Sequence, residues 1–286
     1  MTDVSVHEVG TRDGLQSIST FVPTEVKKSW CRAEFHAGVR EIEVCSLVPV
    51  KLIPQFADAG EVVRHALALE GLTVVALVPN LKGAEKAVEL GVHKINYVIS
   101  VSESHNRANV RRSTEESAAD FERSVALCRS RPKEARPVVV GGLATALGCT
   151  MEGKVPEDRV RRLAVRLAEA GADEIILADT VGYGDPAMVR RLFGAVTRDL
   201  GAVPITAHFH DTRGLGLANV LAALDAGIRA FDVVFMQESM GLKTGVNLEK
   251  LLAVRRTVCA ALGDQPFHGA IAKAGLPKGF TVATSA

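Results

Sequence analysis

Short runs of β-branched residues alternate along the chain with longer segments whose apolar residues recur every three or four positions. The short runs predict buried strands, and the longer segments predict amphipathic helices. The predicted strands are Val4–Val9, Glu41–Ser46, Thr73–Val78, Lys94–Ser100, Pro137–Gly141, Glu174–Asp179, Pro204–His210 and Arg229–Asp232. The predicted helices are Thr24–Ala37, Glu61–Leu69, Ala84–Leu90, Glu115–Arg129, Glu157–Ala170, Pro186–Leu200, Leu215–Ala226 and Leu248–Leu262.

A glycine recurs where four of these helices give way to the next strand, at Gly38, Gly91, Gly171 and Gly227. Glycine suits the left-handed conformation that ends a helix, so these joints mark a repeated β–α unit. Eight such units predict a parallel sheet closed into a (β/α)8 TIM barrel. An open doubly wound sheet is the alternative, but no GxGxxG follows the first strand. Because no linker divides the chain, we expect residues 1–286 to form one catalytic domain, with 263–286 as a tail.

The composition is that of a globular protein rather than a disordered one, with 47% hydrophobic and 23% charged residues. The net charge of +1 argues against a nucleic-acid partner bound through a broad basic face. The five cysteines form no CxxC pair, which favours a reducing compartment. We see no signal peptide and no apolar run of ~18 residues, so we expect a cytoplasmic protein with no membrane segment.

In a barrel of this kind, the carboxyl ends of the strands carry the chemistry. The strongest pattern there is the pair His208 and His210 in the seventh strand. Side chains two apart on a strand point to the same side, so the two imidazoles are expected to converge at the rim. With a carboxylate they suit a divalent metal, and Asp13 at the end of the first strand is the natural third ligand. The alternative is a pair of hydrogen-bonded core histidines.

Other polar residues at strand ends have both a functional and a structural interpretation. Glu43 lies inside the second strand, where a buried carboxylate needs a cation or hydrogen bonds. Arg12 is either that cation or a group that faces substrate, and Glu8 raises the same question. The segment 100–112 is either a solvated loop or an anion contact. For Cys149, a buried small hydrophobic residue is favoured over a nucleophile.

Several segments closely resemble the hydroxymethylglutaryl-CoA lyase family of metal-dependent TIM-barrel lyases and synthases. They are VHEVGTRDGLQS (Val6–Ser17), EIEVCSLVPVKLIPQFAD (Glu41–Asp58), LADTVGYGDP (Leu177–Pro186), HFHDTRGLGLANVLAALDAGI (His208–Ile228), GLKTGVNLEKLL (Gly241–Leu252) and AGLPKGF (Ala274–Phe280). The resemblance implies cleavage of the acyl-CoA substrate 3-hydroxy-3-methylglutaryl-CoA to acetoacetate and acetyl-CoA. It further implies magnesium or manganese as cofactor, and barrels of this type are often homodimers.

The resemblance also implies roles for individual residues. Asp13, His208 and His210 match the metal ligands, and Arg12 matches the arginine that stabilises the enolate of the thioester. Glu43, Asp179 and Gln16 match acidic or polar residues near the substrate. Glu8 matches an interior structural carboxylate.

One part of the family pattern is missing from this sequence. The family carries a Gly-rich loop after the eighth strand, with a catalytic cysteine in a Gly-Gly-Cys-Pro context and an asparagine that completes the metal site. Here Phe231-Asp232 runs directly into 233–241, which resembles the helix that follows the loop. The chain as written therefore lacks the proton donor and one ligand. We predict a strand to about residue 232, a break, and then a helix.

Three alternatives to this lyase follow. A related Claisen-type synthase is disfavoured, because those enzymes usually have an Asp-Arg-Glu order where this chain has Arg12-Asp13, and they need an appended region for which this chain has no length. A lyase for another 3-hydroxyacyl-CoA thioester differs only in pocket shape. The third alternative is a degenerate barrel that lacks the catalytic loop and acts as a binding or partner subunit.

Overall fold

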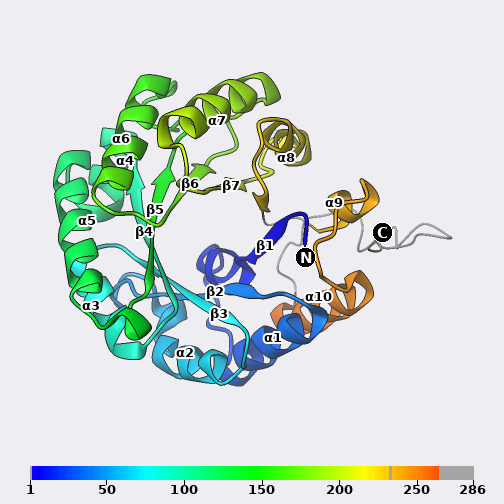
Figure 1. Cartoon of the computed structure of the whole chain (residues 1–286). Coiled ribbons are helices and arrows are strands. Elements are labelled where there is room, and N and C mark those ends of the chain that lie inside the picture. The colour runs from blue at the N-terminus through cyan, green and yellow to red at the C-terminus, as the bar shows by residue number, and fades with distance from the viewer. Residues whose placement is uncertain (1, 232–233, 264–286) are drawn as a thin grey trace. The chain divides into compact units, whose positions relative to one another are not determined.

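The strands lie where the hydrophobic pattern predicts them, in a computed structural model that describes residues 2–231 and 234–263. They form one 8-stranded sheet in the order β7-β6-β5-β4-β3-β2-β1-β8. Because β8 also contacts β7, the sheet is a nearly closed (β/α)8 TIM barrel, as predicted (Figure 1). The strands are β1 Ser5–Glu8, β2 Glu41–Ser46, β3 Thr73–Val78, β4 Lys94–Ser100, β5 Val138–Ala144, β6 Glu174–Asp179, β7 Ile205–Phe209 and β8 Ala230–Phe231.

The helices alternate with these strands, and the bounds of α1, α7 and α10 agree with the prediction to the residue. The helices are α1 Thr24–Ala37, α2 Ala59–Leu67, α3 Leu81–Leu90, α4 Glu103–Val110, α5 Thr114–Arg129, α6 Glu157–Glu169, α7 Pro186–Leu200, α8 Gly216–Asp225, α9 Phe235–Ser239 and α10 Leu248–Leu262. Shorter helical turns are η1 Gly10–Gly14, η2 Pro54–Phe56 and η3 Lys133–Ala135. The predicted helix after the eighth strand is present as α9, whereas the predicted break at 232–233 and most of the tail lie outside the described residues.

Two local predictions have clear outcomes. The four glycines at the joints all have positive φ, with values of 107° at Gly38, 73° at Gly91, 102° at Gly171 and 93° at Gly227. The expected loop after β4 is instead helix α4, whose N-cap Ser102 accepts a hydrogen bond from the backbone N–H of His105. This cap satisfies one of the first backbone N–H groups of the helix. The helix has few apolar residues, so the hydrophobic pattern does not predict it.

The described residues group into two compact units, 2–75 with 234–263 and 76–231. In the second unit, the strands β4 to β7 are parallel, and α3, α5, α6 and α7 lie outside them (Figure 1). One face of β4 packs on this helical layer, where Tyr97 donates a hydrogen bond to Oδ2 of Asp120 on α5 at 2.7 Å. The opposite face carries Lys94, whose ammonium lies 2.6 Å from Oε2 of Glu174 on β6. Alternation along each strand thus separates helix-facing from interior side chains.

The first unit places β1 beside β2, with His7 opposite Glu41 and Glu8 opposite Ile42. Helix α1 packs against α2 and α10. Its buried side chains are Lys27, Cys31, Glu34 and Ala37, which follow helical spacing.

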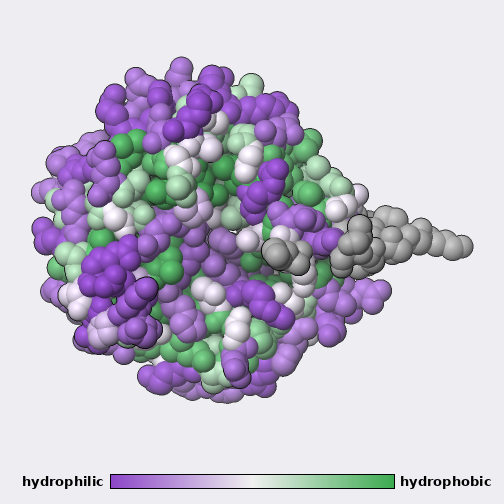
Figure 2. Space-filling view, in the orientation of Figure 1, coloured by the Kyte–Doolittle hydropathy of each residue, from purple (hydrophilic) through white to green (hydrophobic). Residues whose placement is uncertain are grey.

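Hydrophilic side chains predominate around the outer edge of the face drawn in Figure 2, as the charged helix surfaces lead us to expect. Among the described helices, none combines the length and the apolar character that a membrane crossing requires.

Candidate functional site

The chain leaves β1 through a single π-helical turn, η1, that carries two of the predicted site residues. The backbone N–H groups of Arg12 and Asp13 both donate to the carbonyl of Val9, at 3.0 and 2.6 Å. The hydroxyl of Thr11 donates to the carbonyl of Glu43 on β2 at 2.9 Å. The turn is therefore fixed both to the strand that precedes it and to the neighbouring strand.

Arg12 is the cation that the buried carboxylate of Glu43 requires. Its Nε donates to Oε2 of Glu43 at 2.5 Å, and its Nη1 donates to Oδ1 of Asp13 at 2.6 Å. Arg12 is 8% exposed and Glu43 is 4% exposed. Burial alone would lower the pKa of Arg12, but the charges and hydrogen bonds of Glu43 and Asp13 raise it above its ordinary value. Arg12 is thus a fixed cation paired with Glu43, and the role of Glu43 near substrate stays a prediction.

His208 lies on β7 and His210 directly follows that strand. Their Nε2 atoms are 3.1 Å apart, and the rings meet edge to face at 83°. His208 shares a face of β7 with Thr206, which donates a hydrogen bond to Glu174 inside the sheet at 2.5 Å. The two imidazoles therefore converge at the carboxyl end of β7, as the spacing predicted.

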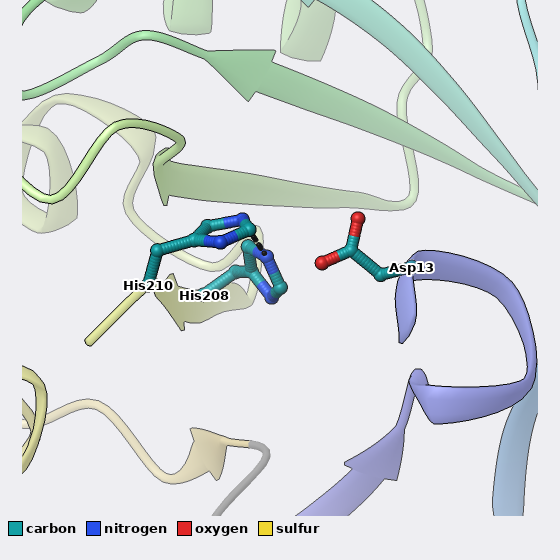
Figure 3. Close-up of side chains that lie close together, drawn as sticks. All are labelled: Asp13, His208 and His210. Carbon is teal, nitrogen blue, oxygen red and sulfur yellow. Dashed lines mark hydrogen bonds between the residues drawn. The ribbon is translucent and has the colours of Figure 1, made fainter. Parts of the chain in front are cut away.

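Asp13, His208 and His210 are the candidate ligands of a divalent metal. Each can offer one ligand atom, and all three side chains are only partly buried. Figure 3 shows Asp13 on the turn that follows β1, and the rings of His208 and His210 at the end of β7. A carboxylate oxygen with two imidazole nitrogens is a donor set that fits a divalent transition-metal or magnesium-like cation.

Asp179 ends β6 and is 1% exposed. It accepts hydrogen bonds from the backbone N–H groups of Tyr183 at 2.8 Å and Gly184 at 3.0 Å, so it fixes the loop that follows the strand. Burial raises the pKa of Asp179, against those hydrogen bonds and the charges of His210 and Arg213, which lower it. Its role near substrate stays a prediction, as does that of Gln16, which is exposed just beyond η1.

Two contacts were not predicted from the sequence. The Oγ of Ser100, at the end of β4, lies 2.7 Å from Nδ1 of His105 on α4. On α1, Nε1 of Trp30 donates to Oε1 of Glu34 at 2.5 Å. The second contact has a sequence signal, because Glu34 falls on the buried stripe of its helix and Trp30 precedes it by one turn. Cys149 is fully buried, which agrees with the hydrophobic interpretation.

Comparison with known proteins agrees with this geometry. The HMGL-like family model matches residues 3–253. Hydroxymethylglutaryl-CoA lyase YngG of Bacillus subtilis is 36% identical over 283 residues, covering 91% of this chain and 93% of that protein. A solved HMG-CoA lyase from Acinetobacter baumannii, in complex with coenzyme A and 3-methylmalate, is 36% identical with a TM-score of 0.89 over 95% of each chain. The solved B. subtilis HMG-CoA lyase is 34% identical with a TM-score of 0.90, over 96% of this chain and 98% of that one. The chain therefore belongs to the HMGL-like family and is an enzyme of the carbon–carbon lyase type.

Proposed function

We propose that this chain is a divalent-metal-dependent lyase that cleaves 3-hydroxy-3-methylglutaryl-CoA to acetoacetate and acetyl-CoA. The observation that carries the proposal is the pair of converging imidazoles, His208 and His210, in a chain of the HMGL-like family, with the cationic Arg12 hydrogen-bonded to Asp13. Identity of 36% to a lyase that was solved with coenzyme A supports an acyl-CoA thioester as substrate.

Asp13, His208 and His210 would hold Mg²⁺ or Mn²⁺ in this proposal. When bound, the ion supplies a Lewis acid that lowers the pKa of the tertiary hydroxyl of the substrate and orients it. A base at the site takes the hydroxyl proton, and His208, Asp13 and a water molecule are the candidates.

Arg12 would stabilise the charge that the reaction creates. As the carbon–carbon bond breaks, its electron pair passes to the acetyl thioester as an enolate, while the former alcohol carbon becomes the ketone of acetoacetate. A guanidinium held rigidly by Glu43 and Asp13 needs no reorganisation to meet that oxyanion. The enolate then takes a proton at carbon to give acetyl-CoA.

A second candidate function rests on the source of that last proton. The sequence has no Gly-Gly-Cys-Pro motif, and Phe231 is followed after three residues by Phe235. The resemblance assigns the proton donor to a cysteine in that motif. A barrel without it would bind metal and thioester yet protonate the enolate slowly.

One assay tests the proposal and separates the two candidates. Chelator-treated protein is given 3-hydroxy-3-methylglutaryl-CoA with or without Mn²⁺, and both products are measured. We expect acetoacetate and acetyl-CoA in equal amounts, dependent on Mn²⁺ and lost in His208→Ala. No product from protein that binds Mn²⁺ and thioester would contradict lyase activity and favour the second candidate.

Chemical rescue tests whether the proton donor is the group that the second candidate function lacks. If the proton donor is the only missing group, a small thiol such as 2-mercaptoethanol should accelerate acetyl-CoA formation by the native chain and leave His208→Ala inactive. Thioesters of other 3-hydroxyacids in the same assay define the substrate. We also propose a homodimer, which light scattering would contradict by giving the mass of a single chain.

A further inference from the structure

A buried carboxyl group lies behind the η1 turn and has no part in the proposed chemistry. Glu34 on α1 is 3% exposed, and its helix buries Cys31 and Ala37 on the same stripe. A carboxyl group in such surroundings is costly unless it is neutral or hydrogen-bonded. The contacts of Glu34 therefore decide how its burial is compensated.

Trp30 and Glu8 are the neighbours of this group. Nε1 of Trp30 donates to Oε1 of Glu34 at 2.5 Å, while Oε2 of Glu34 is buried with no hydrogen-bond partner in the described part of the chain. Burial raises the pKa of Glu34 well above its ordinary value, and the charge of Glu8 raises it further, against the Trp30 hydrogen bond, which lowers it. Both burial and the nearby Glu8 thus disfavour the charged form of Glu34.

Glu8 connects this cluster to the turn. Its Oε1 accepts the backbone N–H of Gly10, the first residue of η1, at 2.5 Å. A Cβ on Gly10 would lie 2.7 Å from that oxygen and 2.9 Å from Cζ2 of Trp30. The backbone of the turn therefore rests directly on the Glu8 carboxylate and the Trp30 ring, which leaves no room for a side chain.

The other side of the turn is held by β2. Thr11 and Arg12 both bond to Glu43, one to its carbonyl and one to its carboxylate. One helical turn of backbone thus lies between two carboxylates, Glu8 at its start and Glu43 on the neighbouring strand. A shift at Gly10 would also move residues 12 and 13, because the backbone N–H groups of Arg12 and Asp13 donate to the carbonyl of Val9, the residue just before Gly10.

We propose that Trp30 and Glu34 are positioning residues that, through Glu8, set where the η1 turn places Arg12 and Asp13. Their effect on metal binding and catalysis rests on the proposed function, whereas their effect on the turn does not. In this proposal, Glu34 orients the indole ring of Trp30 through its hydrogen bond. The indole ring and Glu8 fix the position of Gly10, and the position of Gly10 in turn sets where the side chains of Arg12 and Asp13 lie.

Matched variants separate positioning from bulk stability. Glu34→Gln supplies a neutral amide whose oxygen can still accept from Nε1 of Trp30, whereas Glu34→Leu keeps the approximate volume and cannot accept. We expect Glu34→Leu to weaken Mn²⁺ binding by about 10-fold, the scale seen when a group that orients a metal ligand is lost. Glu34→Gln should bind Mn²⁺ as the native chain does. Trp30→Phe, which keeps a ring without the N–H, should cause a smaller loss.

Two readouts make the outcome decisive. Mn²⁺ affinity is measured by electron paramagnetic resonance, and amide hydrogen exchange is followed across residues 10–14. Faster exchange there in Glu34→Leu, with none in Glu34→Gln, supports the proposal. A Glu34→Leu protein that unfolds more easily but keeps native Mn²⁺ affinity and native exchange at residues 10–14 overturns it.

The same experiment distinguishes failure of the proposed function. If the native chain binds no Mn²⁺, the metal site is wrong, and the exchange at residues 10–14 still decides the role of Glu34. If Glu34→Leu does not fold, Trp30→Phe takes its place with the same two outcomes. Glu174→Leu, at the amino ends of the strands, is the control that should lower stability and leave Mn²⁺ affinity unchanged.

Discussion

Strands β6 and β7 carry polar side chains at both ends, and the two ends differ in how those groups are satisfied. At the amino end, Glu174 lies 2.6 Å from the ammonium of Lys94 and accepts a hydrogen bond from Thr206 at 2.5 Å. At the carboxyl end, the Nε2 atoms of His208 and His210 approach to 3.1 Å. The amino-end cluster contains its own cation, whereas the carboxyl end gathers imidazole nitrogens that suit an added one.

The position of a polar group along these two strands therefore bears on its role: the amino end forms an internal ion pair, and the carboxyl end is where we propose metal binding. A closed ion pair such as Lys94 with Glu174 is retained because removing one member leaves a buried charge. Two converging imidazoles with a carboxylate, for which we propose Asp13, are instead a donor set that fits a metal ion. Substitutions at the amino end should therefore act on stability, and those at the carboxyl end on binding and turnover.

The largest expected effect is at the amino end. Lys94→Met leaves the Glu174 carboxylate buried without its cation, so the free energy of unfolding should fall by about 3–5 kcal/mol, as measured by urea denaturation. The double variant Lys94→Met with Glu174→Met should recover most of this loss. The Mn²⁺ affinity of the folded protein should be unchanged in both variants. A weaker Mn²⁺ affinity in either variant would contradict a purely structural role for the amino-end ion pair.

The next effect is at the carboxyl end. Arg12→Gln removes the fixed guanidinium, so kcat for acetoacetate formation should fall by roughly 10²–10³ with little change in KM. Steady-state kinetics on 3-hydroxy-3-methylglutaryl-CoA measures both constants. An increase confined to KM would instead make Arg12 a substrate anchor. Because Arg12 also neutralises Glu43, urea denaturation of the same variant reports the structural part of its role.

The smallest effect is expected at Glu34, which is buried like the amino-end cluster but linked to the carboxyl-end turn. Its pKa is raised in the folded state, first by burial and then by Glu8. A carboxyl group with a raised folded pKa stabilises the fold below its unfolded pKa of ~4.3, and this contribution is lost as pH rises toward the folded pKa. The native chain should thus lose stability relative to Glu34→Gln above that pH, by at most ~1.4 kcal/mol per pH unit.

Urea denaturation of both proteins between about pH 5 and about pH 8 measures this difference. A gap that stays constant over the range would mean that Glu34 titrates alike in the folded and unfolded chains. In that case its burial has no electrostatic cost, and the inferred rise of the Glu34 pKa in the folded chain is wrong.

Much of the fold could be predicted because local signals and tertiary packing agree. Helix α1 begins after Pro23 and is capped at its end by Gly38, whose φ of 107° only glycine adopts readily. Both ends of this helix can therefore be predicted from the sequence. Helix α4 could not be predicted in this way. Its residues are mostly polar, and its first turn depends on the Ser102 cap rather than on an apolar stripe.

The candidate site divides in the same way. His208 and His210 could be predicted because a period of two on a strand fixes a common face. The sequence allows Arg12 either to pair with Glu43 or to face the substrate, because it does not show which way a side chain in a turn points. The role of Glu34 could not be predicted, because its place on the buried stripe of α1 indicates burial but does not show the nearby charge of Glu8 or the contact of Trp30 with Gly10.

Mn²⁺ titration of chelator-treated protein, followed by electron paramagnetic resonance, decides whether the carboxyl ends of the strands bind a metal ion. We expect the native chain to bind a single ion, and Asp13→Ala and His208→Ala each to weaken that binding by about an order of magnitude or more. Glu174→Leu, at the opposite strand ends, should bind as the native chain does. Equal affinity in the native chain, Asp13→Ala and His208→Ala would contradict the assignment of the carboxyl-end group as a metal site.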